Sequence, residues 1–273
     1  MKQKIIKAAV KAGVWATRLL PAKLWLLIRE ESVVVKRLDY DRYPILLAVD
    51  SWIEHDVRVH SCRKEPETIE WIETWFEPGD VFYDIGANVG AYSLVAHAWL
   101  KGQARIFAFE PGFVTFPQLC KNIFLNKAGA ITPLPIALSD SESLANFNYE
   151  NLTSGGALHS LGEPIDQRGD FYEPVFTLPT ISYRLDEFKR RFALAEPNHI
   201  KIDVDGTEYQ IMKGAQETLN HPQLRSILLE VNEDRDEAEK LVEMLEKAGF
   251  ERRGGQGDNR IYVRRGLTAP GSP

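Results

Sequence analysis

A short loop near residue 85 combines two glycines, an asparagine and a preceding carboxylate. It runs Asp84-Ile85-Gly86-Ala87-Asn88-Val89-Gly90 and follows an apolar run that begins at residue 81. Gly86 can take backbone shapes closed to other residues and lets a ligand approach the main chain closely. Gly90 lets the following helix pack near the strand. A carboxylate at Asp84 repels a pyrophosphate, so the loop favours a ligand that carries an amine or a sulfonium.

A second carboxylate, Glu110, ends the next apolar run, 105–109. A carboxylate at that place can accept hydrogen bonds from both ribose hydroxyls of an adenosine. NAD and S-adenosylmethionine both offer these hydroxyls. Asn88, however, stands where the dinucleotide fingerprint G-x-G-x-x-G has its middle glycine. S-adenosylmethionine carries an amine and a sulfonium, so we predict that it is the cofactor and that its site includes Asp84, Gly86, Asn88, Gly90 and Glu110.

A third apolar run, 131–137, leads into Leu138-Ser139-Asp140. A strand there would bring Ser139 or Asp140 near the adenine amino group. We therefore count Asp140 among the cofactor-binding residues. A plain turn without a ligand is an equally good interpretation of the same residues.

Two further carboxylates, Asp203 and Asp205, lie at the end of the buried run 199–204. Methyl transfer to a hydroxyl requires that the reactants are aligned and that the acceptor loses its proton. A semi-buried position would raise the pKa of Asp203 towards that of a base. We predict Asp203 and Asp205 as the catalytic residues. The alternative is that Asp203 caps the turn at Gly206 and the helix that follows.

Histidines and a metal ion offer other routes to the same chemistry. His159 and His199 are alternative bases, although a structural role is the preferred interpretation of each. Asp203, Glu230 and Asn232 together could form an oxygen-rich set for Mg²⁺, which would lower the pKa of the acceptor hydroxyl. We prefer the interpretation without a metal, in which Glu230 and Asn232 line the floor of the pocket.

The elements that must position these residues alternate between strand and helix. Apolar runs predict strands at 81–85, 105–109, 131–137, 199–204, 226–231 and 261–263, and helical periodicity predicts helices at 65–76, 90–100, 116–126 and 234–248. This alternation predicts an α/β fold, a doubly wound and mostly parallel sheet with helices on both faces. The polar segment 141–179 breaks the rhythm and is expected to be a lid or substrate loop. We divide the chain into an N-terminal extension (1–60), a main domain (61–265) and a disordered tail (266–273).

Charge is unevenly distributed along the chain. The net charge is −6, yet the first 29 residues hold seven basic side chains and no acidic one. The remainder is therefore strongly acidic, which argues against nucleic acid and suits a neutral or cationic ligand. The basic start predicts an amphipathic helix that either lies on an anionic membrane surface or packs on the domain, and we slightly favour packing. No apolar run is long enough to span a bilayer.

The two cysteines, Cys62 and Cys120, have no paired spacing. A disulfide framework or a zinc cluster is therefore not expected, and a reducing compartment is the default. We expect a cytoplasmic protein, with or without peripheral contact at the inner membrane surface through residues 1–29.

At three ordered motifs the sequence resembles the FkbM-type methyltransferases. These are Val81 to Gly90, Phe109-Glu110-Pro111, and Lys201-Ile202-Asp203-Val204-Asp205-Gly206, the last continued by Lys213-Gly214-Ala215. The resemblance covers roughly residues 65 to 250. It implies a class I methyltransferase fold and O-methylation, often of a hydroxyl on a sugar, glycan or natural product. The family commonly has Glu where this chain has Asp205, which shortens the reach of the carboxylate.

The acceptor stays open, because residues 1–60 and the loop 141–179 carry no clear match. The expected partner is a small-molecule or glycan acceptor. One alternative is an NAD-dependent oxidoreductase on the same fold, against which Asp84 and Asn88 count. The other is a membrane-recruited binding protein that keeps the fold without turnover.

Overall fold

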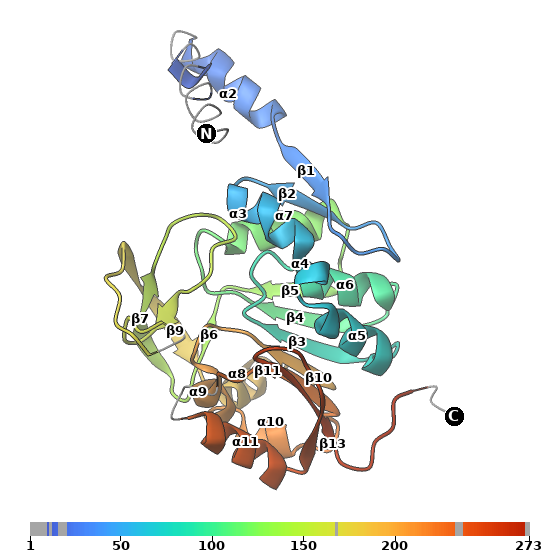
Figure 1. The fold of residues 1–273 in the computed structure, drawn as a ribbon. Helices are drawn as coiled ribbons and strands as arrows, with labels where there is room; N and C mark the ends of the chain where they lie inside the picture. The colour runs from blue at the N-terminus through green and yellow to red at the C-terminus, as the bar shows by residue number, and fades with distance from the viewer. Residues whose placement is uncertain (1–9, 11–12, 16–20, 167–168, 233–236, 271–273) are drawn as a thin grey trace. The chain divides into compact units, whose positions relative to one another are not determined.

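The computed structural model describes residue 10 and residues 13–15, 21–166, 169–232 and 237–270 (Figure 1). Contacts divide the chain into residues 1–35 and residues 36–273. The first unit contains α2 (Ala22–Glu31), and β1 (Val34–Arg37) begins at its end. Most of the predicted basic helix face lies outside the described residues, so membrane contact stays a prediction. Within the described part, no helix is both long and apolar enough to cross a membrane.

A central sheet organises the second unit. In the described part its strands run in the order β12-β13-β11-β10-β3-β4-β5. Pairs from β11 to β5 are parallel, whereas β13 runs antiparallel to β11 and β12. The strands are β3 (Val81–Ile85), β4 (Arg105–Phe109), β5 (Ile131–Leu134), β10 (His199–Ile202), β11 (Ser226–Glu230), β12 (Phe250–Gly254) and β13 (Asn259–Arg264). Chain order reverses between β3 and β10, and ligands of such sheets bind outside the carboxyl ends of strands at this switch.

Helices cover both faces of this sheet (Figure 1). One apolar cluster joins the sheet to α5 (Pro66–Trp75), α6 (Ala91–Trp99) and α7 (Phe116–Leu125). The other joins it to α8 (Leu185–Phe192), α9 (Glu208–Lys213), α10 (Gln216–Asn220) and α11 (Ala238–Lys247). Alternate side chains divide between the clusters: Phe82 lies in the first and Tyr83 in the second. Burial on both faces explains why these strands are apolar throughout, and the predicted doubly wound α/β fold is confirmed.

The segment that follows β1 packs into the first of these clusters. It holds β2 (Leu46–Val49), α3 (Trp52–Asp56), a 3₁₀ turn (Arg58–His60) and α4 (Ser61–Lys64). Leu38, Leu47 and Val59 are buried there beside Trp71. The backbone N–H of Ala48 donates to Asn122 Oδ1 of α7 at 2.8 Å. Residues 38–60, assigned from sequence to the extension, therefore contribute to the core of residues 36–273.

The segment 141–179, predicted as a loop, instead contributes strands to a second, smaller sheet, whereas its expected role as a lid or substrate segment stays a prediction. In the described part its strands run in the order β6-β9-β7-β8, namely β6 (Ala137–Leu138), β9 (Phe176–Tyr183), β7 (Ser143–Tyr149) and β8 (Ser160–Leu161). The polar composition concealed the strands because their polar side chains bond within the sheet. Asn148 Nδ2 donates to the Gly162 carbonyl, and Thr177 Oγ1 donates to Asn148 Oδ1.

The predicted strand 131–137 is also corrected by this sheet. It splits into β5, on the edge of the large sheet, and β6, in the small one. Pro133 lies in β5 and has no N–H to donate, which suits an edge strand. The chain therefore changes sheets just before Asp140.

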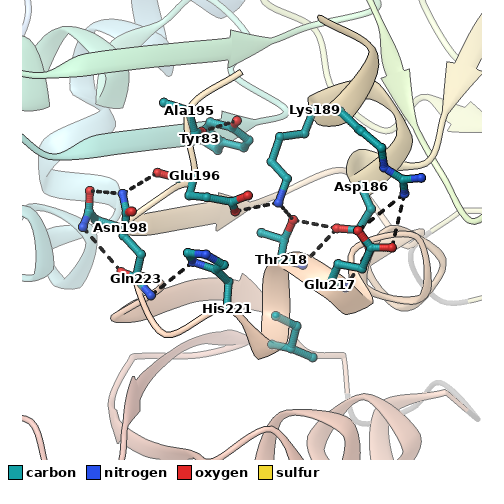
Figure 2. Close-up of polar contacts among 12 residues, drawn as sticks. Tyr83, Asp186, Lys189, Ala195, Glu196, Asn198, Glu217, Thr218, His221 and Gln223 are labelled. Atoms are coloured by element: carbon teal, nitrogen blue, oxygen red, sulfur yellow. Dashed lines mark hydrogen bonds and ion pairs between the residues drawn. The ribbon is translucent and has the colours of Figure 1, made fainter. Parts of the chain in front are cut away.

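Buried polar contacts fix the elements that lead into β10 (Figure 2). The Asp186 carboxylate of α8 accepts from the backbone N–H groups of Glu217 and Thr218 and so caps α10. Lys189 Nζ donates to Glu196 at 2.6 Å and to Thr218 at 2.8 Å. Asn198 Oδ1 then accepts from Val81 N at 2.8 Å, which ties the start of β10 to β3.

Candidate active site

The loop after β3 takes its shape from a close approach to β10. Gly86 has φ +81°, and a Cβ there would lie 1.9 Å from the Asp203 carbonyl oxygen. Gly90 has φ +85° just before α6, where a Cβ would lie 2.5 Å from Leu119 Cδ1. Both positions therefore require glycine. The close approach of Gly86 to Asp203 brings the loop after β3 against the turn after β10, at the switch in strand order.

Glu110 and Asn88 join this loop to the end of β4. The buried Glu110 carboxylate accepts from Asn88 N at 2.9 Å through Oε2 and from Gly112 N at 2.7 Å through Oε1. Burial raises the pKa of Glu110 to about 7, although these two N–H groups oppose the rise. Each oxygen has a further lone pair for a ligand hydroxyl.

Asp84 lies beneath the loop, within β3. Its side chain is 1% exposed, and Oδ2 accepts from Ser93 Oγ of α6 at 2.6 Å. Burial raises the pKa of Asp84, while the neighbouring Lys201 of β10 opposes that rise. Oδ1 has no hydrogen-bond partner among the described residues. The structure does not bring Asp84 to the wall of the pocket described below.

Asp140 also lies away from that pocket. Its Oδ2 accepts from Lys213 Nζ at 2.6 Å, in a partly exposed ion pair. The pocket wall at this point is formed by the chain just before it, Ile136 to Leu138. The switch of sheets at β6 is the reason, because it turns the chain away after Leu138.

Asp203 forms an ion pair that the sequence analysis missed. Lys201 and Asp203 lie two residues apart along β10 and its end, so their side chains share one face. Lys201 is 1% exposed, and its Nζ donates to Asp203 Oδ2 at 2.7 Å. Burial alone lowers the pKa of Lys201, but the charges of Asp203, Glu65 and Asp84 raise it further than burial lowers it.

The ion pair overturns the predicted rise in the pKa of Asp203. Burial alone would raise that pKa, but the Lys201 ammonium outweighs it, and the pKa of Asp203 falls below its usual value. Asp203 is therefore ionised and a weak base. A lysine two residues before the carboxylate, on a strand otherwise apolar, was the available sequence signal.

Asp205 and Asn88 hold the segment that covers the loop. Asp205 has φ +60°, and its Oδ2 accepts from Leu158 N at 2.7 Å. Asn88 Nδ2 donates to the Gly156 carbonyl at 2.8 Å. The turns after β3 and β10 are thus each tied to the connection between β7 and β8.

A pocket lies between these turns and the small sheet. Its volume is about 620 Å³, a figure that includes the part open to solvent. Five predicted site residues line it, and so does His159: the five are Gly86, Asn88, Glu110, Asp203 and Asp205. Gly90 supports the loop from behind, as Asp84 does, without lining the pocket. The remaining wall is largely apolar and includes Ile85, Phe109, Ile136, Leu138, Phe147 and Leu161.

A larger and more open cleft adjoins this pocket. Gly86, Asn88, Ala157, Asp203 and Asp205 line both spaces. Two basic side chains, Arg58 and Lys64, face the cleft. Seven carboxylates line it, namely Glu65, Glu67, Glu150, Asp203, Asp205, Glu230 and Asp258.

The predicted oxygen-rich metal set lies around this cleft. Glu230 lines it, and together with Asn232 it also lines a separate small pocket beside α9 and α11. Burial, with the charges of Asp203 and Glu208, raises the pKa of Glu230 to about 8. Across the described residues, no group of three or more His, Cys, Asp and Glu side chains is arranged to hold a metal ion.

The two histidines differ sharply. His199 is fully buried away from the pocket, where it contacts Ser226 Oγ and Asp80 Oδ2 at 2.7 and 3.1 Å and stacks on Phe76. That is a structural role. His159 lies in the pocket wall, and its Nε2 has no hydrogen-bond partner among the described residues.

Comparison with known proteins finds relatives of this chain. The chain is 27% identical over 190 residues to the hexuronic acid methyltransferase AglP of Haloferax volcanii, which covers 70% of this chain and 72% of the relative. It is 26% identical over 195 residues to the 31-O-demethyl-FK506 methyltransferase FkbM of Streptomyces tacrolimicus, covering 63% and 73%. A solved methyltransferase FkbM from Methylobacillus flagellatus KT superposes with a TM-score of 0.48 at 16% identity, over 69% of this chain but 44% of that one.

A family model also matches more than half of the chain. Residues 84–252 match the methyltransferase FkbM domain, from the loop after β3 to β12. The resemblance drawn from the three motifs is thus confirmed, and the chain belongs to the FkbM methyltransferase family.

Proposed function

We propose that the pocket binds S-adenosylmethionine and that the chain methylates a hydroxyl of a sugar, glycan or natural product held in the adjoining cleft. The observation that carries this proposal is the pair of connected spaces at the β3–β10 switch. Glu110 lines the enclosed one, and Asp203 lies where the two meet. An enclosed pocket that opens onto a wider cleft suits a reaction between a nucleoside-sized donor and a larger acceptor.

The pocket residues fit the donor. Glu110 keeps a free lone pair on each oxygen for the two ribose hydroxyls. Ile136, Leu138 and Phe147 offer an apolar slot for an adenine ring. S-adenosylmethionine, when bound, supplies a methyl group that is already activated by the sulfonium.

The protein's own contribution is alignment and charge. Asp203 is held by Lys201 and stays ionised, so it can accept a hydrogen bond from the acceptor hydroxyl and orient its oxygen. Its lowered pKa makes it a weak base. Asp203 therefore takes the proton only as the hydroxyl becomes acidic during transfer. Glu208 and Asp205 stabilise the turn, because Glu208 Oε1 accepts from Gly206 N at 3.1 Å and Asp205 binds Leu158 N.

The charge of the cleft bears on the class of acceptor. Of its two basic groups, Lys64 pairs with Glu65 at 3.0 Å, and Arg58 Nε donates to the Gly155 carbonyl at 2.8 Å. With the pKa of Glu230 raised to about 8, six other acidic side chains still outnumber these two cations, and this excess of negative charge repels a carboxylated sugar. We therefore infer a neutral or amine-bearing acceptor, in contrast to the hexuronic acid in the name of the Haloferax relative.

A matched set of acceptors tests both parts of the proposal, namely methyl transfer to a hydroxyl and the charge of the acceptor. Aryl glycosides of glucose, glucosamine and glucuronic acid share one ring and differ in charge. With a labelled methyl donor, we expect methyl transfer to the first two and at least about tenfold less to the third, as two like charges brought together cost more than about 1.4 kcal/mol. Mass spectrometry of the products would locate the methyl group on oxygen. Transfer confined to the glucuronide, or to a nitrogen, would contradict the proposal.

A further inference from the structure

His159 carries a buried polar atom that the proposed mechanism does not use. The residue is 9% exposed and lies just before β8, in the wall of the enclosed pocket. Its ring packs against Tyr149 at 5.0 Å and Phe147 at 6.0 Å between ring centroids, both on β7. The small sheet therefore packs against the imidazole of a residue that also lines the pocket.

The hydrogen bonds of the ring fix its tautomer. The backbone N–H of Glu150 donates to Nδ1 at 3.4 Å, so Nδ1 is the unprotonated nitrogen. Burial, followed by the charge of Arg58, lowers the pKa of His159 to about 4. The ring is thus neutral near pH 7, and its single proton is on Nε2. His159 presents an N–H donor.

That donor has no hydrogen-bond partner among the described residues. A buried N–H group without a partner is destabilising and rare in folded proteins, so each instance calls for an explanation. A ligand in the pocket would supply the missing acceptor. The pocket that His159 lines is largely apolar and includes Leu138, Phe147 and Leu161.

We expect the group that accepts the hydrogen bond from Nε2–H to belong to the adenine base of S-adenosylmethionine, which lies beyond the ribose. Glu110, at the end of β4, is the group suited to the ribose hydroxyls. The apolar wall from Ile136 to Leu161 then receives the base. Asp140, which the sequence analysis assigned to the adenine, is instead paired with Lys213. An adenine ring carries three unprotonated ring nitrogens that accept hydrogen bonds.

We propose that the Nε2–H of His159 donates a hydrogen bond to a ring nitrogen of the adenine of the methyl donor, an inference that rests on the proposed function. The geometry is preorganised on both sides. Asn88 holds Gly156 and Asp205 holds Leu158, so the residues leading to His159 are tied to the turns that flank the pocket. His159 is thereby a binding residue that makes the site selective for an adenine base.

The test is calorimetric and needs no acceptor. S-adenosylhomocysteine and its 1-deaza, 3-deaza and 7-deaza analogues, each with one ring nitrogen replaced by C–H, are titrated into the wild-type chain and His159→Phe. We expect His159→Phe to weaken binding of the parent compound about tenfold. One of the three analogues should bind the wild type about tenfold more weakly than the parent compound does. The same analogue should bind His159→Phe as well as the parent compound binds that variant. His55→Phe, at a histidine outside both cavities, should bind all four ligands as the wild type does.

The outcomes separate this inference from the proposed function. If the wild type does not bind S-adenosylhomocysteine, the proposed donor is wrong and this inference falls with it. If it binds, but all three analogues bind equally well, His159 donates to no ring nitrogen and this inference alone is overturned. That comparison uses only the wild-type chain, so it still tests the inference if His159→Phe does not fold. The inference would also be overturned if His159→Phe weakened the binding of every analogue by the same factor as it weakens the binding of the parent compound.

Discussion

The ends of β4 and β10 present carboxylates to the same pocket by opposite means. Glu110 is held by two backbone N–H groups and has a pKa raised to about 7. Asp203 is held by a buried ammonium and has a lowered pKa. Main-chain donors orient a carboxylate without supplying a full charge, whereas Lys201 supplies one. The first arrangement suits recognition of neutral hydroxyls, and the second keeps a charge beside the reacting atoms.

Removing the ammonium should produce the largest effect. Lys201→Met leaves the buried Asp84 and the partly buried Asp203 without their counter-charge, and we expect a loss of about 3 kcal/mol in the free energy of unfolding. Urea denaturation measures this loss. Lys201→Met combined with Asp203→Asn should recover part of it. Lys213→Met, which breaks the partly exposed pair with Asp140, is the control and should cost less than about 1 kcal/mol. A loss below that level in Lys201→Met would refute a buried, charged pair.

Removing each carboxylate in turn comes next in size. Glu110→Ala should raise the Kd for S-adenosylhomocysteine about 10- to 100-fold, because the hydrogen bonds to both ribose hydroxyls are lost. Asp203→Asn should change that Kd less than about threefold while it lowers kcat. Calorimetry and methyl-transfer rates give the two readouts. Equal losses of binding in both variants would contradict separate roles for Glu110 in cofactor binding and Asp203 in methyl transfer.

Glu230, at the end of β11, extends the comparison of carboxylates through the pH dependence of stability. The pKa of Glu230 rises from 4.5 to about 8 because of burial and nearby carboxylates. A carboxyl whose pKa is raised on folding stabilises the fold at low pH, and that contribution is lost as the pH rises through about 8. Glu230→Gln should therefore raise Tm by about 2–4 °C at pH 9 relative to the wild type, and much less at pH 4. Glu239→Gln, on the exposed face of α11, should show no such dependence.

The smallest effect concerns the covering segment. Asp205→Asn keeps a side chain that tolerates a positive φ but removes the charge from the bond to Leu158 N. We expect amide hydrogen exchange at Leu158 to become about 5–10 times faster, which corresponds to about 1 kcal/mol of local opening. The Gly156 amide, whose carbonyl is held by Asn88, should change less. Unchanged exchange at Leu158 would show that Asp205 does not hold the segment.

Sequence reasoning succeeded where local patterns decide the structure. The strands of the large sheet are buried on both faces and therefore read as apolar runs. The glycine at 86 is required by a contact with the Asp203 carbonyl, which explains why the loop motif was informative. Glu110, Asn88, Asp203 and Asp205 were all expected at the site, and all four line one pocket.

It failed where contacts that form only in the folded chain decide the structure. The small sheet pairs β7 with β9 across a long connection, and its asparagines are satisfied only once that pairing exists. Asp84 was expected to face a ligand, but its position within β3 buries it beside Ser93. The lowered pKa of Asp203 required knowing that Lys201 lies on the same face of a fully buried strand.

Thermal unfolding with two ligands tests the central claim most directly, namely that this pocket takes S-adenosylmethionine and not a dinucleotide. S-adenosylhomocysteine at about 100 times its Kd should stabilise the fold by about 2.7 kcal/mol. That corresponds to a rise in Tm of about 5–10 °C for a domain of this size. NAD at the same concentration should leave Tm unchanged. A rise with NAD that equals or exceeds the rise with S-adenosylhomocysteine would contradict the account.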